Sequence, residues 1–207
     1  MTGWTVDGSN LREYCRSADA AHLQIADGTP TPAHLATSVA VAWDPGALFV
    51  GFEASFTSLR SAPASVLRDT ESGKTMRLWE HSDVLEVFIG EDVPHTKRYK
   101  EFEVAPDSRW IDIDVDHRTE PLDADFGWRS GARFFSHVDS HNGRWYAGLK
   151  IPWRALTDAD PRGVSWWCNF YRATGRFHGD ELFAWSSTGL GPGCFHRFEH
   201  FGRLELR

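Results

Sequence analysis

Alternation of apolar and polar residues at every second position is the feature that most constrains this chain. Val39, Val41 and Trp43 alternate with small or polar residues over 38–44, and a second alternating run covers 47–56. Asp44-Pro45-Gly46 between the runs is typical of a turn. Because successive side chains of a strand point to opposite faces, the two runs predict a β-hairpin.

The same pattern recurs along the rest of the chain. Further strands are expected at 84–89, 99–104, 109–116, 131–139, 144–152, 164–174, 182–187 and 203–207. A helical turn is expected near 64–68, and one short helix over 152–160, beginning at Pro152. Short strands separated by turn signals favour an all-β fold, and we expect an antiparallel β-sandwich, immunoglobulin-like or jelly-roll-like.

Length and composition predict one domain over residues 1–207. The chain shows no linker, repeat or low-complexity segment, and 41% of its residues are apolar. Its net charge of −7 argues against nucleic acid as a partner, and no run is long enough to span a membrane. The N-terminus lacks a signal-peptide pattern, which favours the cytoplasm. A chain trimmed of its leader would read the same and would be extracellular or periplasmic.

Aromatic residues and cysteines narrow the chemistry further. Ten Trp and 14 Phe stand against four Tyr, so most rings are expected in the core and a few exposed ones suffice for a binding platform. Cys15, Cys168 and Cys194 form no CxxC pair, which argues against a cysteine zinc site.

Two of the predicted strands carry acidic residues in an apolar context. In 84–89, Glu86 shares a face with Val84 and Phe88, and in 99–104 Glu101 shares a face with Tyr99. Each strand therefore has one apolar face and one mixed face. A solvated sheet face and a ligand site are both open interpretations of the mixed face.

A sugar site needs this mixture of side chains. The C–H face of a pyranose packs on an aromatic ring, carboxylates accept hydroxyl protons, and amide or guanidinium groups donate to the hydroxyl oxygens. The candidates of these types are Trp79, Glu86, Tyr99, Glu101, Asn169 and Arg172.

Several segments together resemble carbohydrate-binding module family 9 and the wider DOMON-like β-sandwiches. The matching pieces are VAWDPGALFVGFEAS, LWEHSDVLEVFIG, YKEFEVAP, RWYAGLKIPWRAL, WWCNFYRAT and FHRFEHFGRLELR, in the family's order. The resemblance implies a sandwich that binds mono- or oligosaccharides without catalysis and needs no cofactor. It also implies that the sugar ring lies between two aromatic side chains.

Position by position, the resemblance suggests a set of contacts. Trp79 resembles one aromatic wall, and Glu86, Arg98 and Asn169 resemble polar contacts beneath it. The second wall is less defined, because Arg172 stands near a position where the family can place an aromatic residue. Tyr171 or Trp185 could serve as that wall.

The family also implies structural calcium, which takes six to eight oxygen ligands. Asp112, Asp114 and Asp116 alternate on one strand, and Asp123 and Asp125 follow in the next loop. Same-face neighbours on a strand lie about 6.6 Å apart, so one ion needs help from the loop. A solvated acidic edge is the alternative interpretation.

Two other functions compete with sugar binding. A glycoside hydrolase would use two carboxylates across a sugar, and Glu86 with Glu101 or Glu103 is the candidate pair. No nucleophile–base arrangement is visible in the sequence, so we expect no enzyme activity. A structural or partner-binding domain with a decayed sugar site is the third hypothesis.

Overall fold

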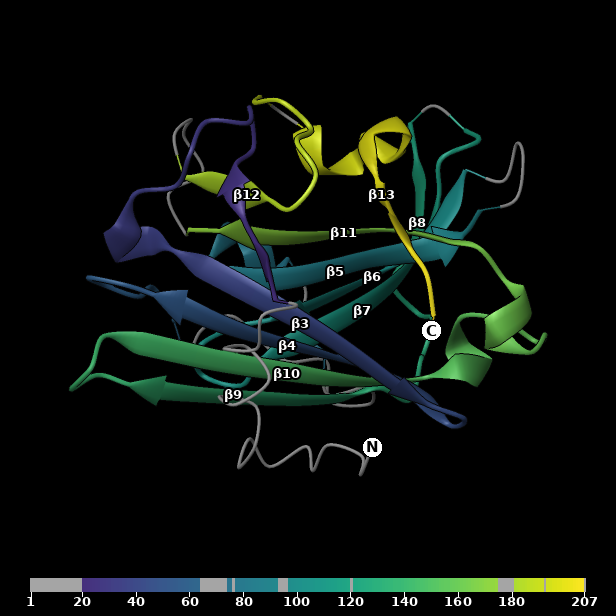
Figure 1. Ribbon diagram of the computed structural model, residues 1–207, viewed down its shortest axis with the longest axis horizontal. Helices are drawn as coiled ribbons and strands as arrows, with labels where there is room; N and C mark the ends of the chain where they lie inside the picture. Colours follow the sequence, from purple (N-terminus) through teal and green to yellow (C-terminus); the bar gives the residue numbers. More distant parts are fainter. Residues whose placement is uncertain are drawn as a thin grey trace.

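The computed structural model describes residues 20–63, 74–75, 77–92, 97–119, 121–174, 181–191 and 193–206. Two antiparallel sheets pack face to face, and the described residues contain no α-helix (Figure 1). None of their helical turns is long and apolar enough to cross a membrane. The prediction of an all-β antiparallel sandwich is confirmed. The predicted helical turn near 64–68 and the N-terminal segment lie outside the described residues.

Sheet A has the strand order β1-β3-β4-β10-β9. Its strands are β1 (Ala21–His22), β3 (Thr37–Asp44), β4 (Ala47–Ser55), β9 (Arg133–Asp139) and β10 (Arg144–Pro152). Both predicted hairpins of this sheet form. The Asp44 Oδ1 atom accepts hydrogen bonds from the N–H groups of Gly46 and Ala47, at 2.7 and 2.8 Å, which closes the β3–β4 turn.

Sheet B has the order β2-β12-β11-β5-β6-β7-β8, and β13 also pairs with β11. Its strands are β2 (Gln24–Ile25), β5 (Val84–Glu91), β6 (Arg98–Val104), β7 (Trp110–Asp116), β8 (Asp123–Asp125), β11 (Trp166–Ala173), β12 (Leu182–Ala184) and β13 (Gly202–Leu204). The short strands β1, β2 and β8 had no alternating signal of their own. They exist because longer neighbours offer them an edge.

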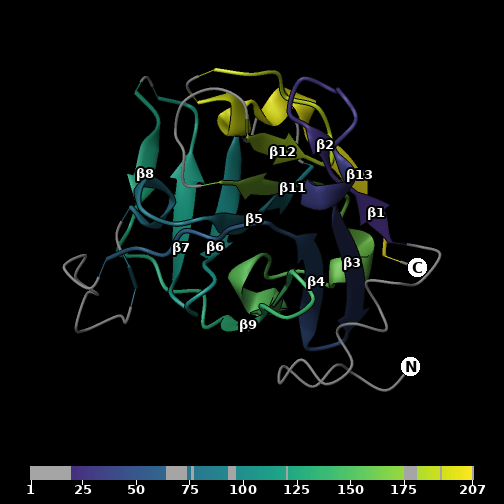
Figure 2. The same cartoon turned by 90° about the vertical axis from the view of Figure 1, so that its left-hand side faces the viewer.

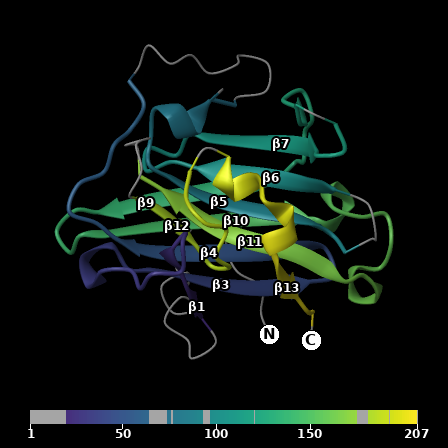
Figure 3. The same ribbon diagram turned by 90° about the horizontal axis from the view of Figure 1, so that it is seen from above.

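Sheet B is covered on both faces. On its inner face Leu85, Val87 and Ile89 pack in the core between the sheets. On its outer face Val84 and Phe88 belong to a second apolar cluster, which includes Phe195 of the C-terminal segment and has Phe201 packed against it. The C-terminal segment lies across β11, β5 and β6 when the molecule is seen from above (Figure 3), and above sheet B in the side view (Figure 2). The face that carries Glu86 is therefore closed from solvent.

The short helix expected over 152–160 does not form. Pro152 ends β10, and a single 3₁₀ turn, η3 (Trp153–Ala155), follows it. The indole Nε1 of Trp153 donates to the carbonyl of Asp44 at 2.7 Å and fixes this turn to the β3–β4 hairpin. The other 3₁₀ turns are η1 (Ala33–Leu35), η2 (Leu78–Glu80), η4 (Pro161–Gly163), η5 (Cys194–His196) and η6 (Phe198–His200).

Candidate functional site

Three glutamates lie together on the outer face of sheet B. Glu86 of β5 pairs in register with Glu103 of β6, and Glu101 follows two residues away on the same face of β6. Their exposed fractions are 3%, 1% and 4%. We call these three residues the glutamate cluster. The strand pairing alone brings them together, because residues opposite each other on neighbouring strands share a face.

Burial raises the pKa values of all three carboxyl groups in the glutamate cluster. Burial first, and then the charge of Glu101, raise the pKa of Glu86 well above its usual value. Burial raises the pKa of Glu101 to about 7, although a hydrogen bond with the Glu103 side chain opposes the rise. The pKa of Glu103 is raised by burial and by both neighbours. Like charges this close cannot all ionise in a dry site, so protonated carboxyls are favoured.

Aromatic side chains cover the cluster. Phe88 follows Glu86 by two residues on the same face of β5, and it stacks on Tyr99 with 5.4 Å between ring centroids. The Tyr99 hydroxyl lies 2.6 Å from Nδ1 of His196. Burial, aided by His117, lowers the pKa of His196 to about 4, so this imidazole is neutral near pH 7. Tyr99 is buried together with the carboxylates and is not a free sugar contact.

Trp79 lies at the border of this cluster. It belongs to η2, and its backbone N–H donates to the carboxylate of Glu103. Its indole is partly exposed and stacks on Phe126, with ring centroids 6.4 Å apart and 21° between the planes. Arg77 precedes η2 in the left-handed conformation, at φ 51°. The structure therefore brings Trp79 and the predicted Glu86 to one face.

The side chains around Trp79 are open to solvent. Arg77 has 69% of its side chain exposed, and its Nη1 lies 3.4 Å from Oε1 of Glu80. Glu80 and His81 have 38% and 37% of their side chains exposed, with 4.0 Å between Oε2 and Nε2. No motif or alternation in the sequence points to these three residues. Glu80 and His81 directly follow Trp79 and Arg77 lies two residues before it, and this adjacency is the only signal that the sequence held.

Asn169 and Tyr171 lie on the same outer face but are bonded within the protein. The Asn169 Nδ2 group donates to the Tyr171 hydroxyl at 2.9 Å and to the carbonyl of Ser186 at 2.8 Å. Its Oδ1 atom accepts from the backbone N–H of Ser186 and of Phe170. The Tyr171 hydroxyl donates to the carbonyl of Phe195, and the two rings stack at 4.1 Å. These contacts fasten the C-terminal segment onto β11.

Two predicted sugar contacts, Arg98 and Trp185, lie away from this face. Arg98 pairs with Asp114, at 2.9 Å, on the opposite face of β6. Trp185 packs against Phe170 of the inner core, with ring centroids 5.6 Å apart. The structure therefore does not bring Arg98 or Trp185 to Trp79.

Arg172 points from β11 into the space between the sheets and is fully buried. Its Nη1 donates to the carbonyls of Leu35 and Ser55, both at 2.9 Å, and to the Thr37 hydroxyl at 3.0 Å. Burial lowers the pKa of Arg172 to about 10. The guanidinium links sheet B to sheet A, and it lies on the opposite face of β11 from Asn169.

The predicted calcium ligand Asp112 has a protein cation beside it. Nζ of Lys74 lies 2.7 Å from Oδ1 of Asp112, and both side chains are about fully buried, at 1% and 2% exposure. The same ammonium donates to the carbonyls of Asp112, Phe126 and Trp128. The other oxygen of Asp112 accepts from the N–H and hydroxyl of Ser130, at 2.8 and 2.5 Å. Lys74 thus supplies the positive charge among these oxygens.

The other predicted calcium ligands lie at the β7–β8 edge. Asp114 pairs in register with Asp125, and its carboxylate lies 2.6 Å from the ammonium of Lys100. Asp125 accepts hydrogen bonds from the N–H groups of Gly127 and Trp128, and Asp123 is exposed. Among the residues that the structure describes, no group of three His, Cys, Asp or Glu side chains is placed to hold a metal ion. Calcium binding stays a prediction.

Comparisons with known proteins give a shared fold. No protein-family model and no curated protein matches this chain. A solved structure of a "putative carbohydrate-binding protein" from Bacteroides uniformis is 17% identical, has a TM-score of 0.72, and covers 98% of this chain and 94% of its own. A family 9 carbohydrate-binding module from Caldicellulosiruptor kristjanssonii, in complex with glucose, is 12% identical with a TM-score of 0.60, covering 100% of this chain and 92% of its own. The complex of this module with cellotriose is 13% identical with a TM-score of 0.61, and the match covers 100% of this chain and 90% of the module.

Proposed function

We propose that this chain binds carbohydrate without catalysing a reaction, with the sugar ring stacked on Trp79. The observation that carries the proposal is the partly exposed indole of Trp79 beside open polar side chains, in a fold shared with modules solved in complex with glucose and cellotriose. A flat indole offers the C–H face of a pyranose the apolar surface that it needs.

The polar contacts come from the rim of η2. The Glu80 carboxylate accepts hydroxyl protons, and the guanidinium of Arg77 donates to hydroxyl oxygens; the two lie 3.4 Å apart. His81 offers a further ring nitrogen. This set replaces part of the set expected from sequence, because Asn169 uses its amide donors inside the protein and Arg172 is fully buried between the sheets.

The glutamate cluster supports this site from below. Glu103 accepts the backbone N–H of Trp79, and the cluster is covered by apolar side chains. Its role is to hold η2 at a defined height above sheet B. We expect modest affinity, because one sugar ring on an open indole buries little area against the cost of association.

Calorimetric titration with glucose and cellotriose tests the proposal. Trp79→Ala should abolish the heat of binding while circular dichroism and thermal unfolding show an intact fold. Trp110→Ala is the matched control, because Trp110 is also partly exposed on sheet B but stacks on Phe134, with centroids 4.7 Å apart, on the other face of the sheet. Equal loss in both variants, or no heat with the unchanged chain, would refute the proposal.

An assay for reducing ends, run beside the titration, separates the two rival functions. Release of reducing ends from an oligosaccharide, lost in Glu101→Gln, would favour a glycoside hydrolase. If the chain gives neither heat of binding nor released reducing ends, a structural or partner-binding domain is favoured.

A further inference from the structure

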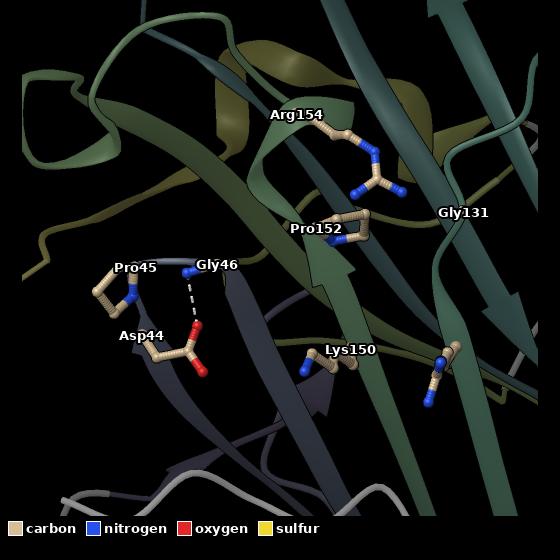
Figure 4. Close-up of a pocket in the computed structure, with 8 residues that line it drawn as sticks. Asp44, Pro45, Gly46, Gly131, Lys150, Pro152 and Arg154 are labelled. Atoms are coloured by element: carbon tan, nitrogen blue, oxygen red, sulfur yellow. Dashed lines mark hydrogen bonds between the residues drawn. The ribbon is translucent and has the colours of Figure 1, made fainter.

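A pocket lies on sheet A, apart from Trp79 and the glutamate cluster. Its volume is about 600 Å³, within the range of small-molecule sites. It is built where β3 turns into β4, β10 ends and β9 begins. Figure 4 shows Asp44, Lys150 and Arg154 around it, with Asp44 bonded to Gly46.

The pocket is lined by three cationic side chains. Lys150 of β10 pairs in register with Arg133 of β9, so the two cations stand opposite each other on one face. Arg154 follows in η3. Like charges directly opposite on neighbouring strands destabilise a sheet unless a counter-charge lies between them.

No ion pair within the described part of the chain supplies that counter-charge. Arg133, Lys150 and Arg154 form no ion pair with any carboxylate there, although the chain carries a net charge of −7. Other basic residues do have acidic partners at short distance, namely Arg98, Lys100, Arg118, Arg162 and Arg203. Three cations without an ion pair to a described carboxylate therefore gather around one pocket, whose lining carries a single carboxylate, Asp44.

The remaining lining residues leave room for a ligand. Asp44, the one carboxylate of the lining, is engaged through Oδ1 by the N–H groups of its own turn. Pro45 and Pro152 add apolar rings. Gly131 has φ +70°, and a Cβ there would lie 3.1 Å from Nη2 of Arg154, so glycine lets the guanidinium approach this backbone.

We infer that this pocket binds an oxyanionic group, a carboxylate, sulfate or phosphate, carried by a small ligand. Guanidinium and ammonium groups form charge-assisted hydrogen bonds with such oxygens. The anion sits between Lys150, Arg133 and Arg154. Its charge offsets the repulsion between Lys150 and Arg133. The proline rings contact any apolar part of the ligand. The site is independent of the sugar site proposed at Trp79.

Calorimetric titration of the full chain at low salt tests the inference, with glucuronate, inorganic sulfate, inorganic phosphate and glucose as probes. We expect the anions to bind and added salt to weaken their binding. Arg133→Gln and Arg154→Gln should each weaken anion binding by about tenfold, the effect of losing one charge-assisted hydrogen bond. Measured in Trp79→Ala, which lacks the proposed sugar site, tighter binding of glucuronate than of sulfate or phosphate assigns the pocket to acidic sugars. The reverse order assigns it to inorganic or phosphorylated ligands.

Controls make the result decisive. Arg162→Gln removes another exposed arginine, whose Nη2 pairs with Asp160 at 2.7 Å outside the pocket, and should leave anion binding unchanged. Trp79→Ala should leave the binding of sulfate and phosphate unchanged, while Arg154→Gln should leave any glucose binding at Trp79 unchanged. Absence of anion binding at low salt, or an equal effect of Arg162→Gln and Arg154→Gln, would overturn the inference whatever the outcome for glucose.

Discussion

Replacing Glu101 by Gln tests whether the glutamate cluster is buried as the structure has it. Gln keeps the shape of Glu and removes the charge. The pKa of Glu101 is raised to about 7 by burial, while in the unfolded chain it lies near 4.5. The unfolded state therefore releases this proton first. Stability from this group is present below the unfolded pKa and is lost as pH rises through about 7.

The size of the loss follows from the two pKa values. Each unit of difference is worth about 1.4 kcal/mol, so a charged Glu101 at high pH costs the folded state about 3 kcal/mol. The group is fully enclosed, so solvent does not reduce this figure much. Between pH 5 and pH 8 the difference in unfolding free energy between Glu101→Gln and the unchanged chain should grow by about 2 to 3 kcal/mol in favour of Gln.

Urea unfolding at pH 5, 6, 7 and 8 measures this difference. The comparison must be between the two chains, because His196 acts in the opposite direction. Its pKa is lowered to about 4 by burial, so stability rises with pH up to about 6.5 as the unfolded imidazole loses its proton. Glu199→Gln is the control, since Glu199 is exposed. A difference between Glu101→Gln and the unchanged chain that stays constant with pH would refute the burial of the cluster.

Three further results are expected. Lys74→Met should lower the unfolding free energy by about 3–5 kcal/mol in urea titration, because it leaves the buried carboxylate of Asp112 without its partner; a loss under 1 kcal/mol would place the pair in solvent. Asn169→Ala should cost about 2 kcal/mol or more, because the Ser186 carbonyl and N–H lose their partners, and it should speed proteolysis of the C-terminal segment. EDTA should leave the midpoint of thermal unfolding unchanged, since Lys74 already neutralises Asp112, whereas a lower midpoint would support calcium binding.

The strands could be predicted from sequence because their signal is local. The alternation in 38–44 and 47–56 matches β3 and β4 within a residue at each end, and the turn at Asp44 closes on its own backbone. β8 could not be predicted in the same way, because Asp123–Asp125 has no apolar alternation. It is a strand only because β7 provides hydrogen-bond partners, which is a tertiary effect.

Strand parity alone predicts which of the candidate side chains share a face with Glu86. Arg98 shares parity with Lys100, and Arg172 shares parity with Phe170, so both face away from Glu86 once the strands form. Treating Arg98 as a contact beneath Trp79 required its side chain to cross the sheet. The family resemblance supplied residue types in the right order, but only parity distinguishes the two faces.

Burial of the outer face could not be predicted from these strands alone. A mixed face with Glu86, Glu101 and Tyr99 reads as solvated or ligand-binding, and the cover over it comes from residues nearly a hundred positions later. Tyr99 meets His196 across 97 residues of sequence. Lys74 reaches the carbonyl of Phe126 across 52 residues in the same way. Contacts at such separations depend on how loops cross a finished sheet, which no periodicity encodes.

This cover changes the meaning of a raised carboxyl pKa. A glycosidase acid also has a raised pKa, but it must reach the glycosidic oxygen. Glu86 and Glu103 have exposed fractions of 3% and 1%, and Phe195 and Phe201 belong to the apolar cluster on their face. The cause of the shift is burial itself, so here the raised pKa reports a dry interior and carries no argument for hydrolysis. Trp79 and Glu80 are the partly exposed side chains beside the cluster, and in the proposed site they supply the ring for stacking and a hydrogen-bonding rim.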